Sequence, residues 1–143
     1  DEQTFNQIYQ ASEHATTAFG ISVLAQVIGT TALTQCDDWL KAFQIHLSKM
    51  RKLTFKFIEE IPFFQNNFPD ATYLAFPELK NTKLTSEEIV ANILKTARVA
   101  LIPGGVNWFE SQSERHIRIC YSTSEAILSE AFDRIKSYTN HLV

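Results

Sequence analysis

The segment 116–126 constrains the fold more than any other part of this 143-residue chain. Ile117, Ile119 and Tyr121 alternate with other side chains, which predicts a short strand with one apolar face. Ser122 and the Glu three residues after it have the spacing of a capping box, which predicts that a helix begins directly after the strand. We therefore expect a strand that runs without a long loop into the last helix.

Arg118 and Cys120 point to the opposite face of that predicted strand. An arginine on a short apolar strand is unusual, and two explanations stay open. In the first, its aliphatic stem lies along a sheet edge and its charge reaches solvent. In the second, the strand holds the guanidinium over a cleft, where its planar fork suits bidentate recognition of a carboxylate or phosphate.

Three helical stretches are predicted in the first part of the chain. A polar, weakly amphipathic helix spans residues 1 to about 17, and an apolar helix that we expect to be well buried follows Ser22. The longest periodic segment, about 36–61, carries apolar residues three or four positions apart and stops at Pro62. Its expected apolar stripe is Trp39, Leu40, Phe43, Leu47, Met50, Leu53 or Thr54, Phe57 and Ile61.

The remaining chain reads as β-α-β-β-α. Strands are predicted at 71–76, at 99–102 and in the segment around Arg118. Thr85 and Glu88 form a second capping box, which opens the helix between the first two strands. The predicted fold class is α/β, of the α+β small-domain kind: N-terminal helices, one long connecting helix, and a small sheet of about three strands with helices on one face.

Composition excludes several classes of function. The net charge is −3 and the pI is about 5.8, so nothing favours nucleic acid or an anionic membrane as a partner. The two cysteines and four histidines have no metal-ligand spacing. A nucleophilic role for Cys120 activated by His116 is not expected, since residues four apart on a strand are about 13 Å apart. We expect a cytoplasmic protein without a metal.

Four motifs, in order along the chain, resemble the class I/II pyridoxal-phosphate-dependent enzymes of fold type I, the aminotransferases and their C–S lyase relatives. Residues 117–125, Ile-Arg-Ile-Cys-Tyr-Ser-Thr-Ser-Glu, are similar to the C-terminal strand that leads into the last helix of that family. Residues 99–105, Val-Ala-Leu-Ile-Pro-Gly-Gly, resemble one of its strand-and-turn motifs, and residues 73–76 resemble the first strand of its small domain. Residues 22–26, with the aromatic-rich helix through 37–40, resemble its passage from large to small domain. The cystathionine β-lyase-like branch is the most similar.

The resemblance implies roles for individual residues. Arg118 stands where the family has the arginine that binds the α-carboxylate of the amino-acid substrate. Gly104, Gly105, Trp108 and Cys120 are candidates for lining the cleft.

The resemblance also implies that the chain is a C-terminal fragment of a longer enzyme. Residues 1–35 would be a helical segment from the end of the large domain, 36–61 the long connecting helix and 62–143 the small C-terminal domain. Its partners would be the large cofactor-binding domain of the same polypeptide, an amino-acid substrate and a second copy in a homodimer. No lysine here stands in a context like that of the family's Schiff-base lysine, so we expect no catalytic residue, no tight binding of pyridoxal 5′-phosphate and no activity from this chain alone.

A second hypothesis belongs to another class. A stand-alone, non-catalytic α/β module could use the long helix and the open sheet face to bind a carboxylate ligand or a protein partner. The sequence leaves the substrate open, and it leaves open whether the parent enzyme transaminates or eliminates.

Overall fold

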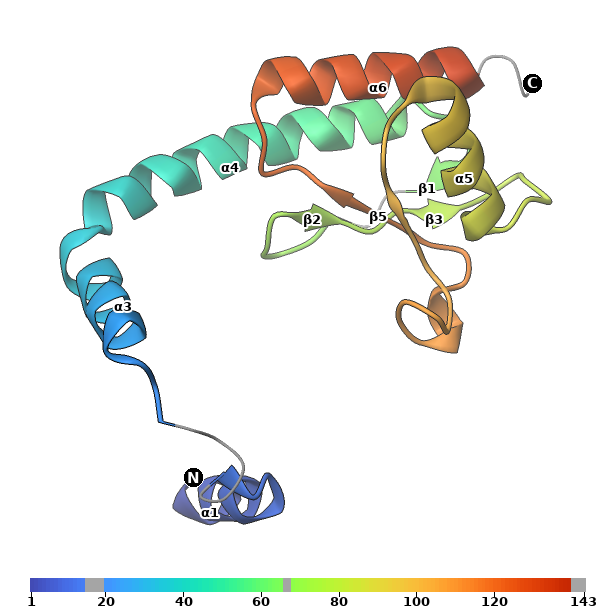
Figure 1. The fold of residues 1–143 in the computed structure, drawn as a ribbon. Coiled ribbons are helices and arrows are strands. Elements are labelled where there is room, and N and C mark those ends of the chain that lie inside the picture. The colour runs from blue at the N-terminus through green and yellow to red at the C-terminus, as the bar shows by residue number, and fades with distance from the viewer. Residues whose placement is uncertain (15–19, 66–67, 140–143) are drawn as a thin grey trace. The chain divides into compact units, whose positions relative to one another are not determined.

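The structure is a computed structural model that describes residues 1–14, 20–65 and 68–139. Its internal contacts divide the chain into two compact units, Asp1–Lys41 and Ala42–Val143 (Figure 1). The boundary falls within the long helix α4 (Asp37–Glu59), which the sequence predicts at 36–61.

The first unit holds α1 (Glu2–Ala11), α3 (Val23–Gln35) and the start of α4. Ser22 caps α3 as its position predicts, because its side chain accepts a hydrogen bond from the Ala25 amide at 3.2 Å. The predicted first helix is too long, since α1 ends at Ala11; part of the predicted stretch, residues 15–17, lies outside the described residues.

The prediction that α3 is well buried is wrong, because none of its residues is buried. Val23, Leu24, Val27 and Ile28 are all more than half exposed. Periodicity shows that a helix has an apolar face, but it does not show that another element of the same chain covers that face.

The described residues of the second unit form two small antiparallel sheets, the greater part of α4, two further α-helices and the short 3-10 helix η1 (Ser111–Ser113), the mixed α and β composition that the sequence predicts. The three-stranded sheet has β5 at its centre, between β2 and β4, and a two-stranded sheet pairs β1 with β3. The bounds are β1 Phe64–Gln65, β2 Leu74–Ala75, β3 Glu78–Leu79, α5 Ser86–Ala97, β4 Ile102–Pro103, β5 Ile117–Cys120 and α6 Glu125–Thr139. The sequence analysis did not find β1 and β3, which lie in segments without a run of alternating side chains, and the strand predicted at 71–76 is only two residues long, Leu74–Ala75.

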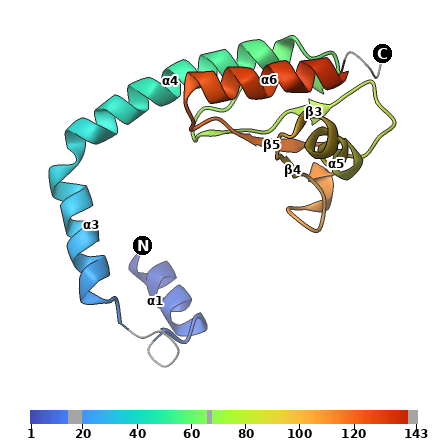
Figure 2. The ribbon, with the colours of Figure 1, turned by 45° about the horizontal axis from the view of Figure 1, so that its top comes forward.

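Helix α6 runs parallel to the second half of α4 (Figures 1 and 2). Two ion pairs between the helices, Lys49 with Glu125 and Lys136 with Glu60, have the same sequence offset, which is the register of parallel neighbours. Between them the rings of Phe57 and Phe132 stack with centroids 4.9 Å apart. Both ion pairs are solvent-accessible, so the ring contact and the core beneath the helices stabilise this packing more than the charges do.

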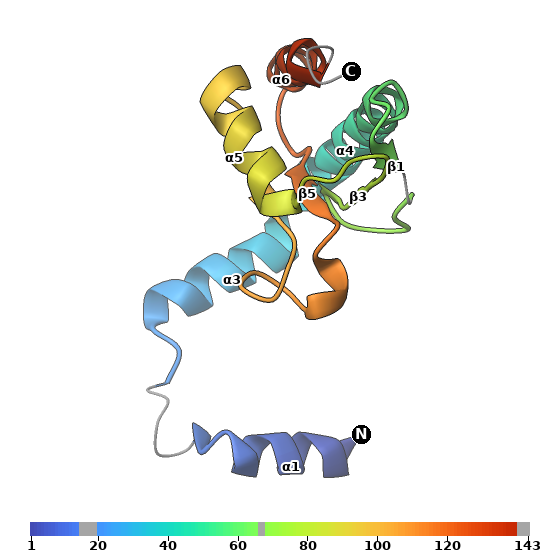
Figure 3. The same cartoon turned by 90° about the vertical axis from the view of Figure 1, so that its right-hand side faces the viewer.

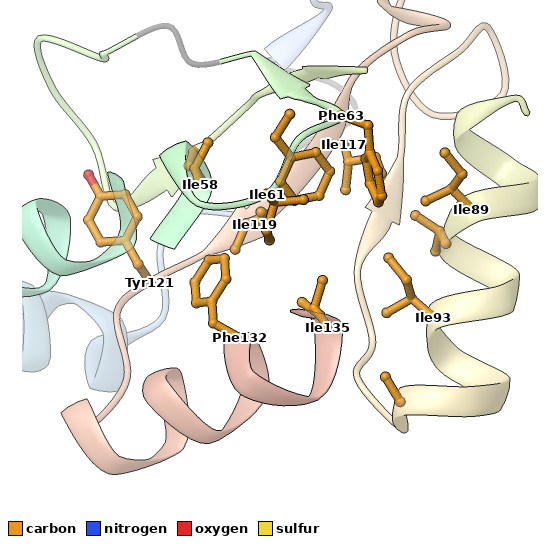
Figure 4. Packing of buried hydrophobic residues seen from close by; sticks show 14 of the residues in the cluster. Ile58, Ile61, Phe63, Ile89, Ile93, Ile117, Ile119, Tyr121, Phe132 and Ile135 are labelled. Atoms are coloured by element: carbon orange, nitrogen blue, oxygen red, sulfur yellow. The ribbon is translucent and has the colours of Figure 1, made fainter. Parts of the chain in front are cut away.

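The core lies between these helices and one face of β5 (Figure 4). Ile117, Ile119 and Tyr121 are all buried, as their alternation predicts. They meet side chains from α4, α5 and α6, and Figure 4 shows Ile58, Ile93 and Phe132 among them. The apolar stripe predicted for α4 is only partly correct, since Trp39 and Leu40 are exposed and the buried residues of the helix are Met50, Thr54, Phe55 and Ile58.

Two local predictions need correction. Ser122 does not cap the last helix: α6 begins at Glu125, and the Ser124 side chain accepts from the Ile127 amide at 3.4 Å. The strand predicted at 99–102 is reduced to Ile102–Pro103, because α5 ends with Arg98 in the left-handed conformation and the chain first pairs with β5 four residues later, at Ile102. The capping box of Thr85 and Glu88 is confirmed.

A substitution at Gly104 tests this packing. A Cβ atom there would stand 1.8 Å from the backbone oxygen of Ser113 and 2.8 Å from that of His116. We expect Gly104→Ala to lower the free energy of unfolding of the second unit by about 3 kcal/mol or to prevent its folding. Urea denaturation followed by near-ultraviolet circular dichroism measures this. Gly29→Ala is the control, since nothing lies within 4 Å of its Cβ position and helix propensity favours alanine there by about 1 kcal/mol. Equal urea midpoints for the two variants would contradict the packing described.

Candidate functional site

The strand register places a set of side chains on the face of the three-stranded sheet opposite the core. Leu74 pairs with Cys120 and Ile102 with Arg118, so all four share that face. We call it the outer face and define it by Leu74, Phe76, Ile102, His116, Arg118 and Cys120. Within the second unit, α5, α6 and the packed half of α4 lie on the other side of β5 (Figures 1 and 3).

Arg118 projects from the middle of β5 and is half-buried on the outer face. Its guanidinium carbon lies 5.7 Å from the ring centroid of Phe109, a cation–π contact. Within the described ranges 1–14, 20–65 and 68–139, no hydrogen bond or ion pair engages its side chain. A cation held on a rigid strand without a protein acceptor is suited to bind an anion.

The neighbouring Arg115 is used differently. Its side chain donates to the backbone oxygen of Leu79 through Nε at 3.1 Å and Nη2 at 2.8 Å, and to that of Thr82 at 3.2 Å. The Leu79 amide in turn donates to the Arg115 carbonyl at 2.6 Å. Arg115 therefore ties the chain after β3 to the start of β5, whereas the guanidinium of Arg118, on the same segment, makes no hydrogen bond or ion pair with the described residues.

A hollow of about 430 Å³ opens beside Phe109. Its lining residues are Phe76, Phe109, Glu110, Gln112, Ser113 and His116. Phe76 and His116 belong to the outer face, and Phe109 borders both the hollow and the Arg118 guanidinium. The rings of Phe76, Phe109 and His116 line the hollow together with one carboxylate, so an organic ligand whose anionic group reached Arg118 would meet apolar surface next to it.

Gly104 and Gly105 border a different hollow, of about 260 Å³, at the first turn of α5. The Gly104 amide donates to the His116 carbonyl at 2.7 Å, and the Gly105 amide donates to Ser113 Oγ at 2.9 Å. Gly105 has a φ of +107°, which favours glycine. The two glycines fix the turn that follows β4, and the structure does not place them beside the Arg118 guanidinium.

The other two predicted site residues are at the surface. Trp108 is 56% exposed. Cys120 is exposed on the outer face, two positions from Arg118, with its sulfur 3.2 Å from Ser122 Oγ. The sequence analysis missed Phe76 and His116 as neighbours of Phe109, because contacts across strands leave no local pattern.

Tyr121 fixes the end of β5 next to the site. Its ring is buried, and its hydroxyl donates to the Thr72 carbonyl at 2.9 Å. Burial raises the pKa of this phenol above its usual value, so the neutral donor persists over a wide range of pH. Tyr121 thus anchors the end of the strand that carries Arg118.

The lysines of the chain lie elsewhere on the described surface. No lysine lines either hollow beside the sheet. Lys49 and Lys136 are engaged in the ion pairs between α4 and α6, and Lys41 lies beside Asp38 on the exposed surface. In the part of the chain that the structure describes, no cluster of His, Cys, Asp or Glu could hold a metal, and no helix is long and apolar enough to cross a membrane.

Comparison with known proteins gave no match to a protein-family profile, but many matches to individual proteins. An aspartate aminotransferase of Pyrococcus abyssi is 36% identical over 113 residues, which are 78% of this chain and 28% of that protein. A putative cystathionine beta-lyase of Mycobacterium tuberculosis is 32% identical over 133 residues, 81% of this chain and 32% of the relative.

Solved structures agree with these matches. The pyridoxal-phosphate-bound C–S lyase of Staphylococcus hominis, complexed with the inhibitor L-cycloserine, superimposes with a TM-score of 0.75 at 25% identity. That match covers 90% of this chain and 32% of the lyase. The chain therefore spans about a third of the length of the relatives it matches.

The different use of the two arginines can be tested by stability. We expect Arg115→Ala to lower the free energy of unfolding by about 1–2 kcal/mol, because it leaves the carbonyls of Leu79 and Thr82 without their charged donor. Arg118→Ala should change it by less than about 1 kcal/mol, since only the contact with Phe109 is lost. Urea midpoints of the two variants and the unmodified chain decide this. A larger loss for Arg118→Ala than for Arg115→Ala would contradict the assignment.

Proposed function

We propose, from the relationship of this chain to the C-terminal portion of pyridoxal-phosphate-dependent, fold-type I aminotransferases and C–S lyases, that it is the substrate-binding C-terminal part of such an enzyme. The relationship, which four sequence motifs predict, is confirmed by the sequence and structural matches. In this proposal Arg118 binds the α-carboxylate of an amino-acid substrate.

The observation that carries the proposal is the state of Arg118. The guanidinium stands on the outer face with its ring contact to Phe109 and, among the described residues, no acceptor. A carboxylate that met it would gain two parallel charge-assisted hydrogen bonds in a partly desolvated position. Such a contact fixes the orientation of the substrate at its α-carbon, which is the positioning that reactions at that carbon require.

The outer face also gives a physical reason for a covering domain. Leu74, Phe76 and Ile102 are only half-buried there, and Phe109 is 37% exposed. Closing a second domain over this face would bury these side chains, exclude water and strengthen the attraction between Arg118 and a carboxylate. We therefore propose that the outer face lines the cleft against the large domain of the same polypeptide.

The cofactor belongs to that other domain in this proposal. Pyridoxal phosphate, where bound, supplies an electron sink for reactions at the α-carbon of amino acids. The lysines of this chain do not fit the Schiff-base role, because none borders either hollow beside the sheet. The chain's own contribution is to bind and orient the substrate. From the relationship to this family we also propose that the intact enzyme is a homodimer and that it is located in the cytoplasm.

Kinetics of the full polypeptide that carries this chain test the proposal. With an amino acid that the enzyme accepts, we expect Arg118→Ala to raise KM and to lower kcat/KM roughly 100-fold, since a desolvated charge pair is worth about 2–5 kcal/mol. Arg118→Lys should recover part of the loss, because it keeps the charge but not the fork.

Arg134→Ala is the matched control. This arginine pairs with Glu130 on the surface of α6, away from the outer face, and its removal should leave KM unchanged. Unchanged kinetics for Arg118→Ala would overturn the proposed role. A polypeptide that lacks any domain with a Schiff-base lysine would instead favour a non-catalytic carboxylate-binding module.

A further inference from the structure

We infer that Phe109 is a positioning residue for Arg118, and that Phe76 and His116 hold its ring in place. This rests on the proposed function of Arg118. The ring would set where the guanidinium stands, so that its N–H edges are directed away from the sheet before a carboxylate arrives.

The first argument is the geometry of the contact. The Arg118 guanidinium carbon lies over the Phe109 ring, 5.7 Å from its centroid. A planar guanidinium can rest on an aromatic face while its N–H groups remain free at the edge, so the ring does not compete with an incoming carboxylate. A carboxylate partner within the protein would occupy those same donors.

The second argument is that Phe109 contacts the ring of Phe76, which is itself stacked on a further ring. Phe76 meets it edge to face, with centroids 5.3 Å apart and planes at 63°. His116 stacks on the other ring of this pair, Phe76, at 4.9 Å and 16°. His116, directly before β5, is two positions from Arg118 and shares its face, so the row of rings leads from the start of β5 to the Arg118 guanidinium.

The third argument is that the loop carrying Phe109 is tied to the same strand. The Phe109 amide donates to the Gly105 carbonyl at 2.7 Å. Gly104, the residue before Gly105, donates its amide to the His116 carbonyl at 2.7 Å. The Gly105 amide donates to Ser113 Oγ. Phe109 is therefore fixed relative to β5 by its backbone as well as by its ring, whereas the adjacent Trp108 is 56% exposed.

A fixed ring has a consequence for binding. A free arginine side chain loses about 2 kcal/mol of rotamer entropy when it is immobilised. If the Phe109 ring already restricts the Arg118 side chain in the free protein, substrate binding loses less of this rotamer entropy. The expected signature of Phe109 is thus a change in substrate affinity that requires Arg118 to be present.

Nuclear magnetic resonance on the 143-residue chain tests the contact without any cofactor. We expect nuclear Overhauser effects between the Phe109 ring protons and the Arg118 δ protons, and an upfield ring-current shift of the Arg118 Nε–H proton. Phe109→Leu should abolish that shift, and Phe109→Tyr, which keeps the aromatic face, should retain it.

The chain contains a matched control in Arg51, whose guanidinium lies 4.8 Å from the ring centroid of Phe68. Phe68→Leu should move the Arg51 signal and leave that of Arg118 in place. Absence of the Overhauser effects in the unmodified chain would overturn the inference even if Phe109→Leu did not fold.

Kinetics of the full polypeptide separate positioning from a merely structural role. We expect Phe109→Leu to lower kcat/KM roughly 3- to 30-fold, mostly through KM, which is the range for a cation–π contact. Phe109→Tyr should restore it. In an Arg118→Ala background, Phe109→Leu should have no further effect, whereas a structural role would still lower the activity.

The outcomes for the two proposals differ. If Arg118→Ala leaves KM unchanged, the proposed function fails whatever Phe109 does. If Arg118→Ala raises KM while Phe109→Leu leaves both KM and the Arg118 signal unchanged, the proposed function stands and the positioning role of Phe109 is wrong.

Discussion

The alternation of side chains along β5 is the constraint on which the rest of this structure depends. Because the period of a strand is two residues, burying Ile117, Ile119 and Tyr121 forces Arg118 and Cys120 onto the other face. One set of side chains forms the base of the core, and the other forms the outer face. A shift of one residue in register would bury the guanidinium among apolar side chains and remove the core of the second unit.

The parts of the fold that follow from local chemistry could be predicted from the sequence. The long helix ends at Glu59, shortly before Pro62, and the capping box of Thr85 and Glu88 marks the start of the next helix. Both features can be predicted because prolines and caps act on residues within one helical turn. The prediction that Ser122 caps the last helix is wrong, because Ser124, two positions later and directly before the helix, accepts the hydrogen bond instead. The burial of α3 and the extent of the strands depend on what packs against them, and local sequence does not contain that information.

The same distinction applies to the candidate site. Arg118 can be found from sequence because an arginine is unusual on a short apolar strand and because the surrounding segment resembles a known family. The placement of Phe109 under its guanidinium could not be found, since it depends on a loop whose course is fixed by Gly104 and Ser113. The roles of Arg115 and Arg118 also cannot be separated by residue type. Only the carbonyls of Leu79 and Thr82, which lie far back in the chain, distinguish them.

The parallel packing of α4 and α6 has a consequence for how the chain is made. The residues that the two helices bring together, such as Phe57 and Phe132, are separated by most of the second unit. During synthesis from the N-terminus, the apolar side of α4 with Met50, Phe55 and Ile58 is complete long before α6 exists to cover it. Contacts of such long sequence separation form slowly, because the intervening chain must be closed into a loop first. The nascent chain therefore carries an uncovered apolar helix until α6 is synthesised, and during this stage it is exposed to aggregation or to capture by a chaperone.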